Sequence, residues 1–241
     1  MNSLEALNDA IVRCRRCPRL VRWREGVAKK PPLRYSGQDY WARPLPGFGD
    51  PDARLFIVGL APAAHGGNRT GRIFTGDRSG DWLYTTLYKF GFSNLPGSLH
   101  RDDGLKLTDC YISAAARCAP PDNKPLPVEF DRCRPYLVRE IQLLKRVRVV
   151  IALGKIGFDE FIKAYAATGA KIPKPRPRFG HGSSACLDDL TLLGSYHPSQ
   201  QNTFTGKLTR PMFESVFRAA RGILDGGPPR DEGLPKPPEW K

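Results

Sequence analysis

Four cysteines stand in two pairs whose spacing suits a metal centre. Cys14 and Cys17 form the run C-R-R-C-P, and fourteen residues separate Cys118 from Cys133. Thiolates from two distant segments can hold structural zinc or an iron–sulfur cluster, and the spacing alone does not decide between these two. Four unrelated buried thiols are the third alternative.

A glycine-rich loop runs from Gly59 to Asp77, directly after an apolar run. Such a loop brings backbone N–H groups close to a ligand, but it lacks the spacing of the P-loop and of dinucleotide-binding loops. It contains Phe74 and, three residues later, Asp77. An aromatic face beside a carboxylate suits a planar base held against a sugar that becomes positively charged. The alternative is a core Phe74 and an Asp77 that caps a helix, and capping does not exclude the chemical role.

A second polar loop, GSYHPSQQNTFTGKLT at 194–209, contains His197. Pro198 fixes the path of the loop, and serine, glutamine, asparagine and threonine side chains follow it. A histidine at the end of a strand is more often structural, but the neighbouring polar loop favours a catalytic role. The sequence contains no GxSxG or HExxH motif, which argues against serine hydrolysis and zinc proteolysis.

Four short apolar runs alternate with helix-like segments, a pattern typical of a parallel sheet covered on both faces. The strand-like runs are 54–60, 109–116, 147–153 and 190–196. The helix-like segments are 3–13, 79–91, 127–145, 154–167 and 210–224. Ligands bind beyond the carboxyl ends of such strands, and both polar loops begin at such ends. We interpret Cys110, in the second run, and Cys186, in a loop before the fourth, as packing residues.

The charge balance favours a polyanionic partner. The chain has 241 residues, with 38 Lys and Arg against 24 Asp and Glu, for a net charge of +14. Cations displace counterions from phosphates, so nucleic acid is the favoured partner. No stretch approaches the ~20 apolar residues of a membrane span. We expect a cytoplasmic, nucleoid-associated protein with no membrane partner, made of one domain (1–225) and a Pro/Gly-rich tail (226–241).

Together the motifs resemble the uracil-DNA glycosylase superfamily, and most closely its iron–sulfur B-type (family 5) members. Four stretches carry the resemblance: GLAPAAHGGNRTGRIFTGD at 59–77, YWARPLPGFGD at 40–50, RCAPPDNKP at 117–125 and SYHPSQQNTFTGKLT at 195–209. The resemblance covers about residues 8 to 222. It implies a three-layer α/β/α sandwich with a central four-stranded parallel sheet. It also implies a [4Fe–4S] cluster on Cys14, Cys17, Cys118 and Cys133, with a structural role.

The resemblance implies a role for each site residue. Phe74 stacks on the extruded base, and Asp77 places or activates water or stabilises the sugar cation. His197 donates to a base carbonyl oxygen, and Asn123 matches a second polar active-site position. The expected substrate-binding positions are Gly59, Ala61, Ala63, Phe74, Ala114, Gln201 and Asn202, with Gln201 as the residue that fills the vacated stack.

Two positions separate this chain from other branches of the superfamily. Ala63 stands where those branches carry an acidic or amide residue, and Ala114 stands where A-type enzymes carry an asparagine that reads uracil. A site that lacks a side chain to hydrogen-bond the edge of the base discriminates less strongly between bases. We therefore expect uracil to be the preferred substrate, with hypoxanthine, xanthine or modified pyrimidines also accepted.

The expected enzyme is a monofunctional, monomeric N-glycosyl hydrolase that acts on damaged bases in double-stranded and single-stranded DNA. We expect a monofunctional enzyme because no motif in the sequence marks a lysine as the nucleophile that would form a Schiff base. Two other classes stay open. One is a non-catalytic, metal-stapled nucleic-acid-binding module. The other is an X-type relative that traps the abasic sugar, although the extra basic loop of such proteins is absent from the sequence.

Overall fold

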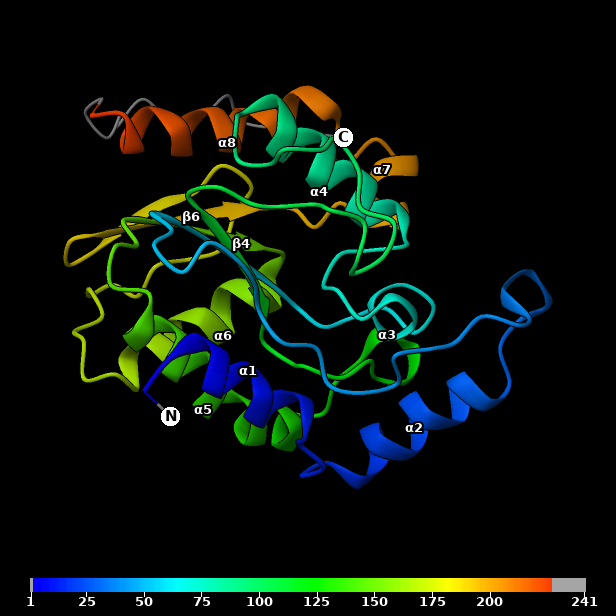
Figure 1. Ribbon diagram of the computed structural model, residues 1–241. Coiled ribbons are helices and arrows are strands. Elements are labelled where there is room, and N and C mark those ends of the chain that lie inside the picture. Colours follow the sequence, from blue (N-terminus) through cyan, green and yellow to red (C-terminus); the bar gives the residue numbers. More distant parts are fainter. Residues whose placement is uncertain (1, 227–241) are drawn as a thin grey trace.

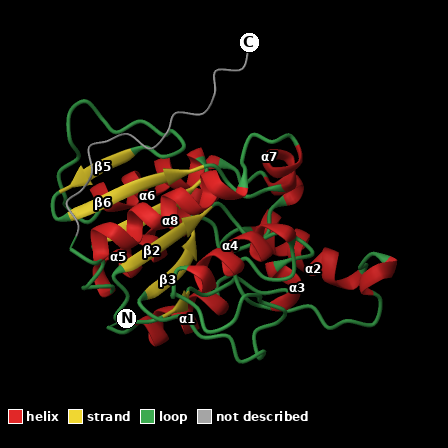
Figure 2. Cartoon of the chain, turned by 90° about the horizontal axis from the view of Figure 1, so that it is seen from above, coloured by secondary structure: helices red, strands yellow, loops and turns green. Residues whose placement is uncertain are grey.

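A six-stranded sheet forms the centre of the computed structural model, which describes residues 2–226. The strand order is β1-β3-β2-β4-β6-β5. Their bounds are β1 Phe48–Gly49, β2 Leu55–Gly59, β3 Cys110–Ala114, β4 Val149–Leu153, β5 Ser184–Leu187 and β6 Leu190–Ser195. The four inner strands run parallel to one another, and the two edge strands, β1 and β5, pair antiparallel (Figure 2).

Helices cover both faces of this sheet, so the predicted three-layer α/β/α sandwich with a central four-stranded parallel sheet is confirmed. In Figure 1, α4 and α8 lie above the sheet, while α1, α5 and α6 lie below it. The long helices are α1 Leu4–Val12, α2 Pro18–Lys29, α4 Arg78–Lys89, α5 Pro127–Leu143, α6 Lys155–Ala166 and α8 Arg210–Leu224. The short ones are α3 Gly67–Thr70, α7 Gln200–Phe204 and the 3-10 turns η1 Leu33–Tyr35 and η2 Pro121–Asn123.

Alternate residues of each inner strand enter opposite layers of the core, because successive side chains of a strand point to opposite faces. In β2, Leu55 and Ile57 belong to the core shared with α4 and α8. Phe56 and Val58 belong to the core shared with α5 and α6. Both faces are therefore dry, which explains why the inner strands are continuous apolar runs.

Helix α2, the edge strands and the short helical turns were not predicted from the sequence. Helix α2 lies where no helix was expected, with Pro18 at its first position and a buried side formed by Leu20, Val21 and Arg24. The edge strands β1 and β5 are short, with 2 and 4 residues. The placement of Cys186 in a loop was wrong: it lies in β5 and is exposed, whereas Cys110 is fully buried in β3 as expected.

Residues 227–241 of the expected tail lie outside the described part of the chain. Within residues 2–226, no helix is both long and apolar enough to cross a bilayer.

Candidate active site

The two polar loops meet at one edge of the sheet because parallel strands end together there. Gly59, the last residue of β2, is paired with Ala114, the last residue of β3. The loop that follows β2 is tied to β3 by backbone hydrogen bonds, from Ala115 N–H to Gly59 O and from Ala116 N–H to Leu60 O, both 2.9 Å. Small residues, Gly59 and Ala114 to Ala116, thus stand side by side where β2 and β3 end.

Phe74 lies directly against the end of β2. A Cβ atom on Gly59 would stand 2.6 Å from the Phe74 ring, so only glycine leaves space for it. Phe74 has a φ of 53°, a left-handed conformation that is strained for a bulky residue. The Tyr84 hydroxyl donates to the carbonyl of Ile73 at 2.9 Å, which fixes the backbone just before it. Strain held by its surroundings in this way is typical of functional sites.

The imidazole of His197 stacks on Phe74, although 122 residues of chain separate them. Their ring centroids are 5.8 Å apart and the planes differ by 29°. Asn202 donates its side-chain amide to the carbonyl of His197 at 2.9 Å, so this residue holds the loop in place. Burial lowers the pKa of His197 to about 4. The imidazole is therefore neutral near pH 7 and retains one N–H donor.

Asp77 begins α4 as its N-cap, as its sequence position suggested. Its Oδ1 accepts the backbone N–H of Gly80 at 3.0 Å. Its Oδ2 is directed at Gly66, where any Cβ would collide with it, and the same spot faces the side chain of Ala63. Burial raises the pKa of Asp77, while the backbone N–H groups of Gly80 and Ser79 oppose that shift. One carboxylate oxygen thus caps α4, while the other lies toward the glycine-rich loop.

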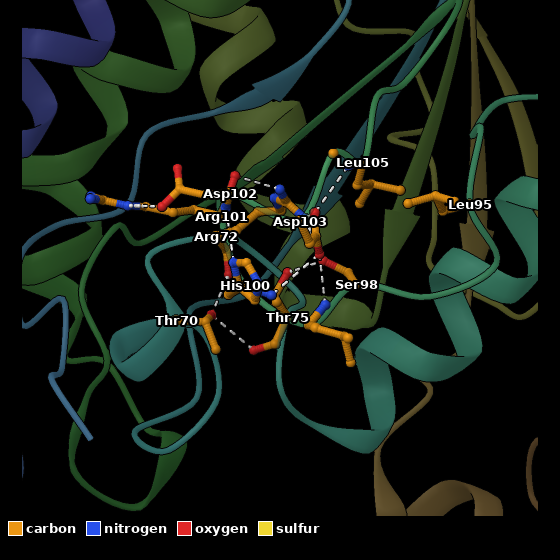
Figure 3. A network of polar contacts seen from close by, with 12 residues as sticks. Thr70, Arg72, Thr75, Leu95, Ser98, His100, Arg101, Asp102, Asp103 and Leu105 are labelled. Atoms are coloured by element: carbon orange, nitrogen blue, oxygen red, sulfur yellow. Dashed lines mark hydrogen bonds and ion pairs between the residues drawn. The ribbon is translucent and has the colours of Figure 1, made fainter. Parts of the chain in front are cut away.

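A buried polar network holds this loop from behind (Figure 3). Arg72 pairs with Asp103 at 2.8 Å and donates to Ser98 Oγ at 2.8 Å. The Ser98 hydroxyl is in turn 2.6 Å from that of Thr75, next to Phe74. Asp103 also accepts the backbone N–H of Leu105 at 3.0 Å, which folds the segment that carries it. Sequence reasoning missed these residues, because nothing along the chain links an arginine at 72 to an aspartate at 103.

Two predicted site residues lie apart from this cluster. Asn123 is exposed in η2 with a left-handed φ of 56°. Within the described residues, no hydrogen bond or ring contact joins it to Phe74, Asp77 or His197. Gln201 is exposed on α7. The same helix carries Phe204, which is 65% exposed and lies under the guanidinium of Arg78 at 4.3 Å. Phe204 was missed, although an aromatic residue in the loop that follows His197 was a visible signal.

The four paired cysteines converge from the segment between α1 and α2, which carries Cys14 and Cys17, from the loop after β3 and from α5. Cys14, Cys17, Cys118 and Cys133 line one small cavity. Arg24 donates to Cys118 Sγ at 2.9 Å, and the backbone N–H of Arg117 donates to Cys133 Sγ at 3.4 Å. Both guanidinium groups line the cavity, and the Nε–H of each is buried without a partner. Across residues 2–226, no three His, Cys, Asp or Glu side chains are grouped tightly enough for a metal ion.

Known proteins match this chain along most of its length. A family model described as the uracil DNA glycosylase superfamily matches residues 46–221. A Type-5 uracil-DNA glycosylase of Thermus thermophilus is 48% identical over 220 residues, which cover 91% of this chain and 97% of that protein. One of Mycobacterium bovis is 48% identical over 223 residues, with 92% and 82% covered. A Type-4 uracil-DNA glycosylase of Pyrobaculum aerophilum is 26% identical over 225 residues, with 93% and 94% covered.

Substituting Gly59 tests the close approach of Phe74. Gly59→Ala places a methyl group into the ring of Phe74, so we expect the free energy of unfolding to fall by about 1–3 kcal/mol. Urea denaturation measures this change. Gly97→Ala is the matched control, because a Cβ there has no atom within 4 Å. Equal unfolding midpoints for the two variants would contradict the predicted contact.

Proposed function

The chain belongs to the uracil-DNA glycosylase superfamily, and from this membership we propose that it hydrolytically removes uracil from DNA and leaves an abasic site. The observation that carries the proposal is the convergence of Phe74, His197 and Asp77 at one edge of the sheet. It would act in the cytoplasm on nucleoid DNA, as a monomer, on both single and double strands. A charge of +14 favours such a partner.

Recognition begins when the damaged nucleotide leaves the base stack, at a cost of a few kcal/mol that a mismatched base reduces. Phe74 offers its aromatic face to the extruded base. Helix α7, with Gln201 and the exposed Phe204 one turn apart, occupies the space that the base vacates. An aromatic side chain fills such a space without needing a hydrogen-bond partner there.

Bond breaking puts negative charge on the leaving base and positive charge on the sugar. The neutral His197 donates its N–H to a carbonyl oxygen of the base, and its low pKa keeps it neutral near pH 7. In its ionised form, Asp77 opposes the sugar cation and orients water toward it. The raised pKa of Asp77 makes this carboxylate a better proton acceptor than an exposed aspartate.

The pocket should accept more than one base. Ala63 and Ala114 carry no hydrogen-bonding group, and Ala114 is 1% exposed within the core beside β2. A site without a side chain that hydrogen-bonds the base cannot strongly reject bases whose hydrogen-bonding groups differ from those of uracil. Hypoxanthine, xanthine and hydroxymethyluracil are thus proposed as further substrates. Asn123 is proposed as a polar group that approaches only when DNA is bound.

We also propose a [4Fe–4S] cluster on Cys14, Cys17, Cys118 and Cys133, and the residues present fit such a group. Two tetrahedral ligands of a single zinc ion would place their sulfurs about 3.8 Å apart, whereas a cluster of four irons holds its thiolates more widely. The buried Nε–H groups of Arg24 and Arg117 have no partner and offer hydrogen bonds to an anionic centre, although the Arg117 guanidinium also pairs with Glu140. When bound, the cluster would fasten α1 and α2 to the loop after β3.

A base-release panel tests the proposed activity. Duplexes that carry uracil, hypoxanthine, xanthine or hydroxymethyluracil are incubated with the protein, and abasic sites are revealed by alkali. We expect uracil to be released fastest and no strand break before alkali, because the enzyme is monofunctional. Base release from none of the four substrates would leave a non-catalytic nucleic-acid-binding protein. A DNA adduct that survives SDS would indicate an X-type trap.

Asp77→Asn separates the chemistry of the carboxylate from its helix cap, because asparagine caps helices equally well. We expect single-turnover uracil release to fall about 10²–10³-fold, with thermal unfolding unchanged. Wild-type release should decline as the pH drops through the raised pKa of Asp77. That decline lies above the ordinary carboxyl pKa of about 3.9. A folded Asp77→Asn variant with near-normal rates would remove Asp77 from the mechanism.

Cys118→Ser tests the cluster without measuring activity. We expect the purified wild-type protein to hold about four irons per chain and to absorb broadly in visible light. The variant should lose most of its iron and unfold at a lower temperature. Cys186→Ser is the matched control, because Cys186 is exposed on β5. Stoichiometric zinc in place of iron would favour the zinc alternative.

A further inference from the structure

Two stacks of arginine on aromatic side chains lie over the glycine-rich loop. In the first, the guanidinium carbons of Arg34 and Arg69 are 4.8 and 4.4 Å from the centroid of the Tyr35 ring. The imidazole of His65 stacks on the same ring at 5.9 Å, and its Nδ1 is 2.9 Å from the Tyr40 hydroxyl. Arg34 stands at the exposed end of this assembly.

The second stack is centred on Trp41. The guanidinium carbons of Arg43 and Arg101 are 5.5 and 4.8 Å from the centroid of its ring. Both arginines are exposed. Arg101 also pairs with Asp102 at 3.2 Å. Arg43 therefore carries the less compensated charge of the two.

Both stacks are attached to the loop that carries Phe74 and Asp77. Trp41 donates its backbone N–H to the carbonyl of Arg69 at 3.0 Å. Arg69 donates to the carbonyl of Gly76 at 3.3 Å, immediately before Asp77. The two stacks thus lie beside the site and are hydrogen-bonded to its loop. We call Arg34 and Arg43, with the rings of Tyr35 and Trp41 beneath them, the arginine strip.

The strip carries positive charge that the protein does not neutralise. Among residues 2–226, neither Arg34 nor Arg43 has a carboxylate within ion-pairing distance. The charge of Arg34 also acts on a neighbouring side chain. The pKa of His65 is lowered mainly by burial and then by the positive charges of Arg34 and Arg69. A guanidinium that stacks on a ring keeps its in-plane N–H groups free, in the geometry that matches a phosphate.

We propose that Arg34 and Arg43 bind backbone phosphates of the same strand that carries the extruded nucleotide. This inference rests on the proposed function, because it takes the loop 59–77 as the place where that nucleotide enters. A nucleotide in the site brings its own backbone to the edge of the loop, whereas the complementary strand lies a groove width away. The strip therefore serves single-stranded and double-stranded DNA alike.

The test measures binding to DNA that the enzyme cannot cleave. Fluorescence anisotropy follows the full-length protein on a single strand and on a duplex, each with a tetrahydrofuran abasic analogue, at several salt concentrations. For Arg34→Gln we expect the slope of log K against log salt to shrink by about 0.9 on the duplex and about 0.7 on the single strand. At 0.1 M salt those slopes correspond to about eightfold and about fivefold weaker binding. Arg43→Gln should do the same.

Arg148→Gln is the matched control, because Arg148 is an exposed arginine just before β4, at the opposite end of the sheet. It should bind both DNAs like the wild-type protein. Arg34→Gln and Arg43→Gln variants that match this control would overturn the proposal. A loss on the duplex alone would also overturn it, because the strip would then contact the complementary strand. Since the analogue contains no base, a protein without glycosylase activity would fail the base-release panel and leave this measurement intact.

Discussion

The candidate site depends on one close approach, that of the Phe74 ring to the end of β2. The ring can lie there only because Gly59 has no side chain. Its left-handed backbone is then held by Tyr84 from within the core and by the network of Arg72, Asp103 and Ser98 from behind. Every other element of the site takes its place relative to this ring: His197 stacks on it, and Asp77 begins the helix that follows.

Burial acts on the two titratable groups in opposite directions and suits both to their proposed roles. It lowers the pKa of His197 and raises that of Asp77, since a dry environment disfavours either charge. His197 thus becomes a neutral donor. The backbone N–H groups at the start of α4 favour the ionised form of Asp77 and oppose this upward shift of its pKa. A single physical cause therefore yields a neutral donor and a carboxylate that binds a proton more readily than an exposed one.

The inner strands and five of the helices could be predicted because each is an apolar run or a periodic face in its own right. Helix α2 could not, because its buried side includes a charged residue, Arg24, whose partner Cys118 is 94 residues away. The edge strands were missed because only pairing with a neighbour defines them. Within the site, Phe74, Asp77 and His197 could be named, but their contacts depend on the strand order. Asn123 could be named from a motif, but its exposed position in η2, away from Phe74 and His197, could not be read from the sequence.

The N-cap position of Asp77 has a consequence for how this protein can change over evolution. Serine, threonine and asparagine would each begin α4 as well as aspartate does, so folding alone tolerates four residue types there. Only the carboxylate can face a sugar cation. Selection for stability alone therefore does not preserve the carboxylate at position 77. A lineage could drift into a well-folded protein that still binds DNA but no longer repairs it.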